Sequence, residues 1–273
     1  MRMTRKEFLV GTAGLSLTGA ASPVKSMLGT RAIESEGEVF ENPYVTDGLI
    51  AMWDGEWNAG PGRHDGNAEI WRDIVGNTIA TPYVHSGTGG GFGWGDNCLS
   101  TSNGCVFKTQ VGVGLTSCTV EVVSLIRGTN GITSLVGSFG TPQVAADGSS
   151  NNGGIVLGWY NYSNDAHTFW FASSPWSRRY IWHVGSNTVG RVLSVVWEGG
   201  NLPCYFFMDG TLKDYNEQST LGMNMLPFCI GATHSTGNEY LWGDFYNVRV
   251  YERALSEEEV LANYEVDVER FGL

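Results

Sequence analysis

Three acidic residues alternate near the C-terminus, in the run Glu265-Val-Asp267-Val-Glu269. Side chains on a β-strand alternate between its two faces, so on a strand this spacing would place all three carboxylates on one face of a sheet. Two carboxyl groups about 5–5.5 Å apart can cleave a glycosidic bond, one as nucleophile and the other as acid and base. The chemistry available to the run therefore depends on whether it lies on a strand.

The residues immediately before the acidic run have the signals of a helix. Ser256 is a natural N-cap, and Glu259 three residues later completes a capping box. Apolar residues then recur at helical spacing, which predicts that one face docks onto the rest of the protein: Val260, Leu261, Tyr264 and Val268. The stretch LSEEEVLANYEVD is therefore predicted to form a short C-terminal helix.

A helix that continues through the acidic run changes what the three acids can do. Glu265 and Glu269 would share one solvent-exposed face, and Asp267 would point elsewhere. A solvated acidic helix end is the favoured interpretation. Catalysis by Glu265, Asp267 and Glu269 is the alternative.

Most of the chain before this helix has the pattern of short strands. Runs rich in β-branched and aromatic residues are typical of strands, and they occur at 48–55, 118–126, 153–160, 167–173, 179–185, 191–200, 203–214, 228–232 and 244–252. Within 203–214, Asp209-Gly210 predicts a hairpin turn. Many strands with no helical stretches between them predict an all-β, two-sheet antiparallel β-sandwich with one short C-terminal helix.

Composition and charge exclude two classes of protein. The chain has 273 residues, of which 42% are hydrophobic and 16% charged, which is typical of a packed domain and not of a disordered one. The formal net charge is −12, with no cluster of Lys and Arg after residue 31, so nucleic acid is not expected as a partner. No apolar run reaches the length of a membrane-spanning helix, so no membrane span is expected.

The first residues have the features of an export signal. A basic start is followed by a short apolar stretch and then by the small residues Gly19-Ala20-Ala21. The segment TRKEFLV resembles a twin-arginine signal, with Lys6 where the second arginine normally stands. We expect an exported protein, at the cell surface, in the periplasm or outside the cell, with an export signal at 1–21, an acidic linker at 22–42 and one domain at 43–273.

Five cysteines leave at least one thiol unpaired in an exported protein. Cys98 and Cys105 flank a short loop and are candidates for a local disulfide. The other three lie in apolar, strand-like runs, where a free thiol behaves as a small hydrophobic group: Cys118, Cys204 and Cys229.

Several segments together resemble a known family. The C-terminal segments YFFMDGTLKD, FCIGA and YLWGDFYNVRVYERALSEEEVLANYEVD, and the N-terminal segments GLIAMWDG and IWRDIVGN, resemble a laminin-G-like, concanavalin A-like jelly roll. The resemblance covers residues 44–273 and implies two antiparallel sheets. It most often implies glycan binding or adhesion, although the same fold also carries glycosidases and structural modules. In lichenase-type β-glucanases of this fold the Glu-x-Asp-x-Glu run lies on a mid-chain strand, whereas here it follows the predicted helix.

Aromatic residues are the candidate ligand contacts. Trp and Tyr present flat faces that stack on the C–H surfaces of sugars, together with a polar edge. The five candidates lie beside Gly or polar loop residues: Trp57, Trp94, Trp176, Tyr180 and Trp242. Core packing must account for most of the ten tryptophans, so only one or two are expected to contact a ligand.

Oxygen-rich side chains form the candidate metal set. Asp and Asn with loop carbonyls can hold Ca²⁺, and related jelly rolls often carry a structural calcium. The candidate ligands are Asp54, Asp73, Asn77, Asp96, Asn97 and Asp244. The same residues are equally typical of side-chain-stabilised turns.

The sequence thus favours an exported, non-catalytic carbohydrate-binding or adhesion module whose partner is a glycan or polysaccharide. One alternative is a divergent glycoside hydrolase of the concanavalin A-like fold. The other is a structural or display protein, such as a phage-like or surface-appendage subunit.

Overall fold

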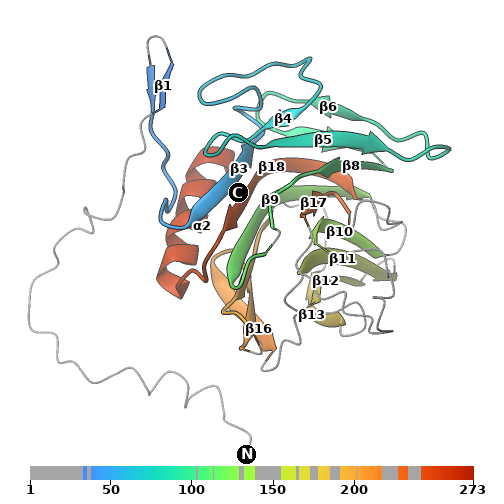
Figure 1. The fold of residues 1–273 in the computed structure, drawn as a ribbon. Coiled ribbons are helices and arrows are strands. Elements are labelled where there is room, and N and C mark those ends of the chain that lie inside the picture. Colours follow the sequence, from blue (N-terminus) through green and yellow to red (C-terminus); the bar gives the residue numbers. More distant parts are fainter. Residues whose placement is uncertain are drawn as a thin grey trace, which may run out of the picture.

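The computed structural model describes the chain from residue 33 onwards, with gaps. The described residues are 33–35, 38–102, 104–112, 114–128, 132–138, 155–163, 166–172, 178–184, 191–200, 202–216, 227–232 and 241–273. Apart from a separate pair of short strands near the N-terminus, they form two antiparallel sheets that face each other, with one helix, α2, outside them (Figure 1).

The first sheet contains the strands nearest to the helix. Its order is β16 (Thr211–Asn216), β15 (Cys204–Met208), β14 (Arg191–Trp197), β9 (Cys118–Gly128), β18 (Trp242–Tyr251), β7 (Leu99–Thr101) and β6 (Phe92–Trp94). Strand β3 (Leu49–Asp54) also pairs with β18. Every one of these pairings is antiparallel.

The second sheet lies on the side of the sandwich away from α2 (Figure 1). Its order is β13 (Arg178–Val184), β12 (Ala166–Ala172), β11 (Val156–Ser163), β10 (Ile132–Gly137), β17 (Cys229–Ile230), β8 (Cys105–Lys108), β5 (Ile79–Val84) and β4 (Trp71–Arg72). Both sheets contribute to one apolar core, in which Val120 and Phe245 of the first sheet and Phe107 and Leu157 of the second are fully buried. The predicted all-β, two-sheet antiparallel sandwich is confirmed.

The predicted C-terminal helix is also confirmed. Helix α2 (Glu257–Phe271) begins at Ser256, whose side chain accepts a hydrogen bond from the Glu259 backbone N–H, while the Glu259 carboxylate accepts one from the Ser256 N–H. This is the capping box that the sequence predicts. At the other end Gly272 adopts the left-handed conformation typical of a helix C-terminus.

The predicted docking face of this helix is right for Val260, which is buried, and wrong for Leu261. Leu261 is 43% exposed, and the buried residues of α2 are Val260, Asn263 and Asp267. The physical reason is that the helix covers charged residues of the first sheet, so that polar side chains on the helix satisfy the groups beneath them.

The hairpin between β15 and β16 turns at the predicted position. Asp209 and Gly210 have φ angles of 52° and 67°, and positive φ at both central residues is the geometry of a type I′ turn. Gly210 also lets α2 approach, because a Cβ at this position would lie 2.8 Å from the Tyr264 ring.

The cysteines form no disulfide, and all five are free. The predicted pairing of Cys98 with Cys105 is therefore wrong. Cys98 immediately precedes β7 of the first sheet, whereas Cys105 begins β8 of the second sheet and is buried in the core. The short loop between them thus connects the two sheets.

The N-terminal segments fall mostly outside this description. The proposed export signal at 1–21 lies outside the described residues. Within the predicted linker, β1 (Ile33–Ser35) pairs with β2 (Glu38–Phe40), and this pair lies apart from the sandwich (Figure 1). No described helix is long and apolar enough to cross a membrane.

Candidate functional site

The acidic run lies on α2 and not on a strand. Asp267 is fully buried, and its two carboxylate oxygens accept hydrogen bonds from the Arg249 guanidinium at 2.7 and 2.6 Å. Glu265 and Glu269 are exposed on the helix. The three carboxylates therefore do not share one face, and Asp267 is held in an ion pair.

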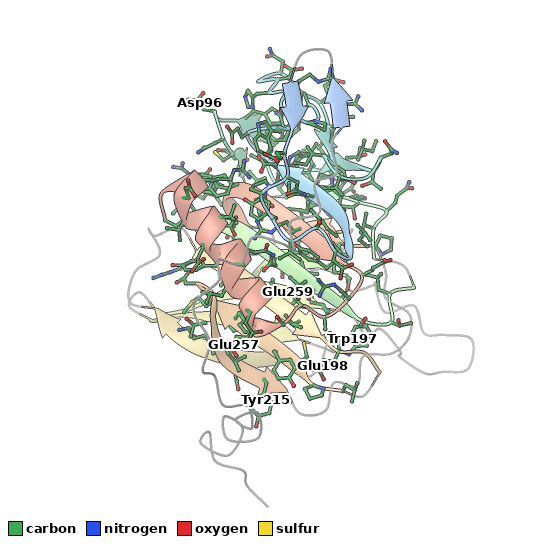
Figure 2. The ribbon with its side chains drawn as sticks, turned by 90° about the vertical axis from the view of Figure 1, so that its left-hand side faces the viewer. Asp96, Trp197, Glu198, Tyr215, Glu257 and Glu259 are labelled. Carbon is green, nitrogen blue, oxygen red and sulfur yellow. The ribbon has the colours of Figure 1, made fainter. Side chains whose placement is uncertain are left out.

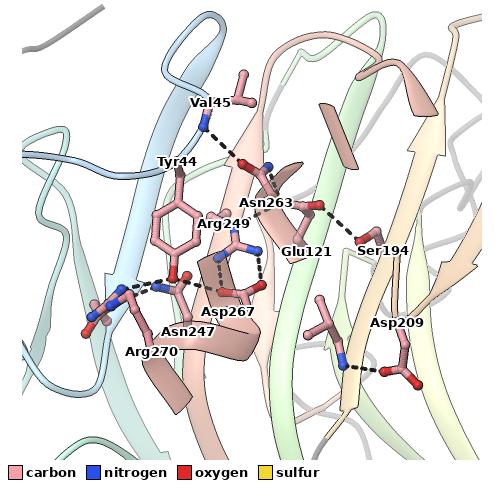
Figure 3. Close-up of polar contacts among 12 residues, drawn as sticks. Tyr44, Val45, Glu121, Ser194, Asp209, Asn247, Arg249, Asn263, Asp267 and Arg270 are labelled. Carbon is pink, nitrogen blue, oxygen red and sulfur yellow. Dashed lines mark hydrogen bonds and ion pairs between the residues drawn. The ribbon is translucent and has the colours of Figure 1, made fainter. Parts of the chain in front are cut away.

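A buried polar cluster fills the space between α2 and the outer face of the first sheet (Figure 3). Arg249 lies between Asp267 and Glu121, whose carboxylate accepts from the Arg249 Nε at 2.9 Å and from the Asn263 amide at 2.7 Å. The Tyr44 hydroxyl donates to Asp267 at 2.8 Å. Because the cluster is closed to solvent and its members bind one another, its role is to fix the helix to the sheet.

Burial decides the protonation behaviour of this cluster. It raises the pKa of Glu121, the charge of Asp267 acts in the same direction, and Arg249 opposes both. Burial likewise raises the pKa of Asp54, which Arg270 opposes. The pKa of each of these two carboxyl groups is raised, but protein encloses both groups, so a substrate has no access to them.

The second sheet has a different composition from the first. Its described strands contain no Asp or Glu at all. A hydrolase needs a pair of carboxyl groups across the bond that it cleaves. The strands of this sheet therefore offer no such pair.

The same sheet is rich in aromatic residues towards the β13 edge. Strands β11, β12 and β13 contain Trp159, Tyr160, Tyr162, Phe169, Trp170, Phe171, Tyr180 and Trp182. The strand register pairs Trp159 with Phe169 and Phe169 with Trp182. In a second row it pairs Gly158 with Trp170 and Trp170 with Tyr180.

Alternation along β11 assigns these two rows to opposite faces of the sheet. Leu157 lies in the core, so positions 158, 170 and 180 belong to the face turned away from the first sheet. Of the five aromatic candidates from the sequence, Tyr180 lies in this row. Its partner Trp170 was not among the candidates, although the aromatic run HTFWFAS could have indicated it.

The other candidate aromatics have different surroundings. Trp94 donates its indole N–H to the Ala68 carbonyl at 2.7 Å and packs edge-to-face on Trp71, with ring centroids 5.6 Å apart. Trp57 lies under the Arg270 guanidinium, 4.2 Å from its ring centroid. Trp242, the first residue of β18, is 53% exposed. Trp176 lies outside the described residues.

The predicted calcium ligands are already occupied by protein donors. Asp54 accepts from the backbone N–H groups of Glu56 and Trp57, from the Asn247 amide and from Arg270. All of these donors compete with a cation for the same oxygen lone pairs.

Asp73 and Asp244 are occupied in the same way. Asp73 accepts from three backbone N–H groups and from the Thr78 hydroxyl. Asp244 accepts from the Ser100 hydroxyl and pairs with Arg127. Each carboxylate therefore stabilises local structure.

The remaining ligands of the predicted set do not complete a cation site. Asn77 and Asp96 are exposed, and Asp96 lies at the periphery, remote from Glu257 and Glu259 at the start of α2 (Figure 2). Across the described ranges, no three His, Cys, Asp or Glu side chains gather closely enough to hold a metal. The residues proposed as ligands therefore do not fit a calcium ion.

Comparison with known proteins agrees with this architecture. The family model Laminin_G_3, described as the concanavalin A-like lectin/glucanases superfamily, matches residues 133–261. No curated protein matches the sequence.

Two solved structures illustrate the similarity in fold. The chain is similar to Trypanosoma rangeli sialidase in complex with 2,3-difluorosialic acid, with a TM-score of 0.57 and 15% identity over 87% of this chain. It spans only 36% of that sialidase. It is also similar to domain 4 of AbnA, a GH43 extracellular arabinanase from Geobacillus stearothermophilus, in complex with arabinotriose, with a TM-score of 0.55 and 15% identity. That match covers 79% of this chain and 98% of the arabinanase domain.

At these identities the structural matches show the fold alone. Together with the family match over residues 133–261, they confirm the resemblance to a laminin-G-like, concanavalin A-like jelly roll that the sequence indicates.

Proposed function

We propose that this protein is an exported, non-catalytic module that binds carbohydrate on the aromatic strands of its second sheet. The observation that carries the proposal is the composition of that sheet. Strands β11 to β13 contain eight aromatic residues, and the described strands of the whole sheet contain no carboxylate.

Aromatic rings suit sugars because a pyranose or furanose presents patches of C–H groups between its hydroxyls. A flat ring covers such a patch and removes it from water, while neighbouring polar groups bind the hydroxyls. Positions 170 and 180 are paired on adjacent strands, about 5 Å apart, so two rings there would form one continuous platform. The arabinotriose complex of the similar arabinanase domain supports a sugar as the ligand.

The described strands of this sheet contain no carboxylate that could cleave a sugar bound there. The alternative catalytic residues Glu265 and Glu269 lie on α2, across the first sheet from the proposed platform. A sugar on β11–β13 would therefore lie out of reach of both. This arrangement supports binding without hydrolysis.

Affinity electrophoresis of the full chain in gels containing arabinan, xylan, mixed-linkage β-glucan or a sialylated glycoprotein tests the proposal. We expect at least one polymer to retard the protein and no reducing ends to appear on prolonged incubation. Chelator should leave the retardation unchanged, because the candidate calcium ligands are occupied by protein donors. A panel with no retardation would remove the carbohydrate proposal and favour a structural or display role.

Export is part of the same proposal and rests on the N-terminal sequence alone. A basic start, an apolar stretch and small residues at 19–21 support removal of residues 1–21. N-terminal sequencing of protein recovered outside the cytoplasm should begin close to residue 22. Recovery of the intact Met1 from that fraction would contradict export by a cleaved signal.

A further inference from the structure

A small groove lies at the β4 edge of the second sheet, opposite to the β13 edge. It has a volume of about 240 Å³ and lies between the loop at 59–63 and the β4–β5 hairpin. Pockets for drug-sized ligands usually measure about 300–1,000 Å³. The groove therefore has the size for a single sugar residue or another small group.

Two arginines line this groove, Arg63 and Arg72, and both are exposed. Arg63 makes one long hydrogen bond, from Nη2 to the Ala59 carbonyl at 3.4 Å. Arg72 has no side-chain hydrogen bond or ion pair within the described part of the chain. Neither guanidinium is paired with a described carboxylate.

This is unusual for the arginines of this acidic protein. The others whose side chains the structure describes all pair with Asp or Glu: Arg127, Arg191, Arg249, Arg253 and Arg270. Among the arginines whose side chains the structure describes, the two without a carboxylate partner both line this groove. Their donors are therefore available to a ligand at one place.

The loop that carries Arg63 is held rigidly. Asn58 is fully buried and exchanges two hydrogen bonds with the Asp65 backbone, at 2.9 and 2.8 Å. Gly60 has a φ of 120°, and a Cβ there would lie 3.2 Å from Arg63 Nη2, so the glycine leaves room for the guanidinium. The Arg72 N–H donates to the Asn58 carbonyl, which ties the loop to β4.

The rest of the lining suits a ligand whose remaining part is neutral and carries hydroxyl groups, more than a ligand with a second charge. Asp73 belongs to the lining, but four donors already bind its carboxylate. Asn77 is exposed and offers an amide, and Ile79 is 40% exposed and offers an apolar surface. Amide and apolar groups together are what a sugar ring contacts.

We infer that this groove binds the carboxylate of an acidic sugar, with Arg63 and Arg72 as its anion-binding residues. Guanidinium groups form paired, charge-assisted hydrogen bonds with carboxylates. The net charge of −12 repels long polyanions from the surface as a whole, which favours one isolated carboxylate over a nucleic acid. Since seven inter-strand spacings, or roughly 34 Å, separate β4 from β13, this site is separate from the proposed aromatic platform.

Titration of the full chain with D-galacturonate, followed by NMR through the arginine Nε–H signals, tests the inference. We expect saturable shifts in the signals of Arg63 and Arg72. The methyl ester of galacturonate, which lacks the charge, should bind about tenfold more weakly or worse. Arg63→Gln and Arg72→Gln should each weaken galacturonate binding by about tenfold.

The controls separate a sugar site from general attraction of anions. Lys213→Gln removes the same charge from β16 and should leave galacturonate binding unchanged. Acetate and phosphate should bind more weakly than galacturonate. The inference would be overturned if the methyl ester, acetate or phosphate bound as tightly as galacturonate. It would also be overturned if both arginine variants bound galacturonate as the parent does. The gels with neutral polysaccharides test the aromatic platform, and the galacturonate titration tests the groove. Either proposal can therefore be rejected while the other stands.

Discussion

Arg249 is the residue on which the attachment of α2 depends. It is fully buried between two carboxylates, those of Glu121 and Asp267, at 2.9 and 2.6 Å. Burial raises the pKa of Glu121, the charge of Arg249 opposes this shift, and the charge of Asp267 adds to it. The consequences of removing each member therefore differ.

Arg249→Met leaves two buried carboxylates without their cation. Breaking a buried ion pair by removal of one partner costs about 3–5 kcal/mol, so we expect a loss of unfolding free energy of this size. Glu121→Gln leaves the Arg249–Asp267 pair neutral and should cost less. Urea denaturation of the two variants and the parent measures both, and an Arg249→Met variant as stable as Glu121→Gln would contradict this view of the cluster.

Glu121 also gives the stability a specific pH dependence. Its pKa is raised in the folded chain by burial. The folded state therefore takes up a proton at Glu121 more readily than the unfolded state does. This proton uptake stabilises the fold fully below the ordinary pKa of 4.5, and the stabilisation is lost as the pH rises through the pKa of Glu121 in the folded chain. The parent should therefore gain stability relative to Glu121→Gln as the pH is lowered from neutrality towards 4.5. A difference that stays constant or shrinks over that range would show that the pKa of Glu121 is not raised.

At the scale of elements, the capping box determines where α2 begins. Ser256→Ala removes the acceptor of the Glu259 N–H, which should cost about 0.5–2 kcal/mol. Ser256→Asp keeps an acceptor at the same position and is the matched control, since Asp caps about as well as Ser. Thermal or urea denaturation compares the two. Equal losses in both variants would mean that the side-chain acceptor at the N-cap does not matter.

The same helix shows what periodicity can and cannot predict. The cap and the hairpin turn at Asp209-Gly210 were predictable because both depend on residues close in sequence. The buried face was not, because Asn263 and Asp267 read as exposed polar residues until Glu121 and Arg249 are known to lie beneath them. Their partners are more than a hundred residues away or on another element.

Strands β4 to β8 were not predicted from the sequence, for a similar reason. Strands β4 to β8 contain two to six residues each, and Gly-rich turns separate several of them. Runs this short carry little alternation to detect. Some of them are stabilised by pairing with a distant strand, as β8 is by β17. The Gly-rich stretch 86–95, for example, contains β6 without a run typical of a strand.

The candidate site was predictable only in part. The strands that carry Trp170 and Tyr180 were recognised as strands, but their pairing depends on the register between β12 and β13. The oxygen-rich set was misleading for the opposite reason. Asp54, Asp73 and Asp244 look like cation ligands in sequence, yet their hydrogen-bond partners come from the backbone and from distant residues such as Arg270 and Arg127.

At the scale of the whole molecule, the two sheets carry different kinds of residues. The first sheet carries the buried charges and is covered by α2, which fixes the fold. The second carries aromatic residues at one edge and the arginine-lined groove at the other, and its described strands hold no acid. Both proposed binding surfaces therefore lie on the sheet that the helix leaves uncovered.

The most direct test of this account measures where a bound polysaccharide lies. Affinity electrophoresis with the polymer that retards the parent should show binding weakened about tenfold in Trp170→Ala and in Tyr180→Ala, with unchanged denaturation midpoints and no release of reducing ends. Trp242→Ala, an aromatic truncation on the first sheet at a position that is 53% exposed, is the control and should bind as the parent does. Full binding by Trp170→Ala and Tyr180→Ala together with loss in Trp242→Ala would contradict the account and place the ligand on the first sheet.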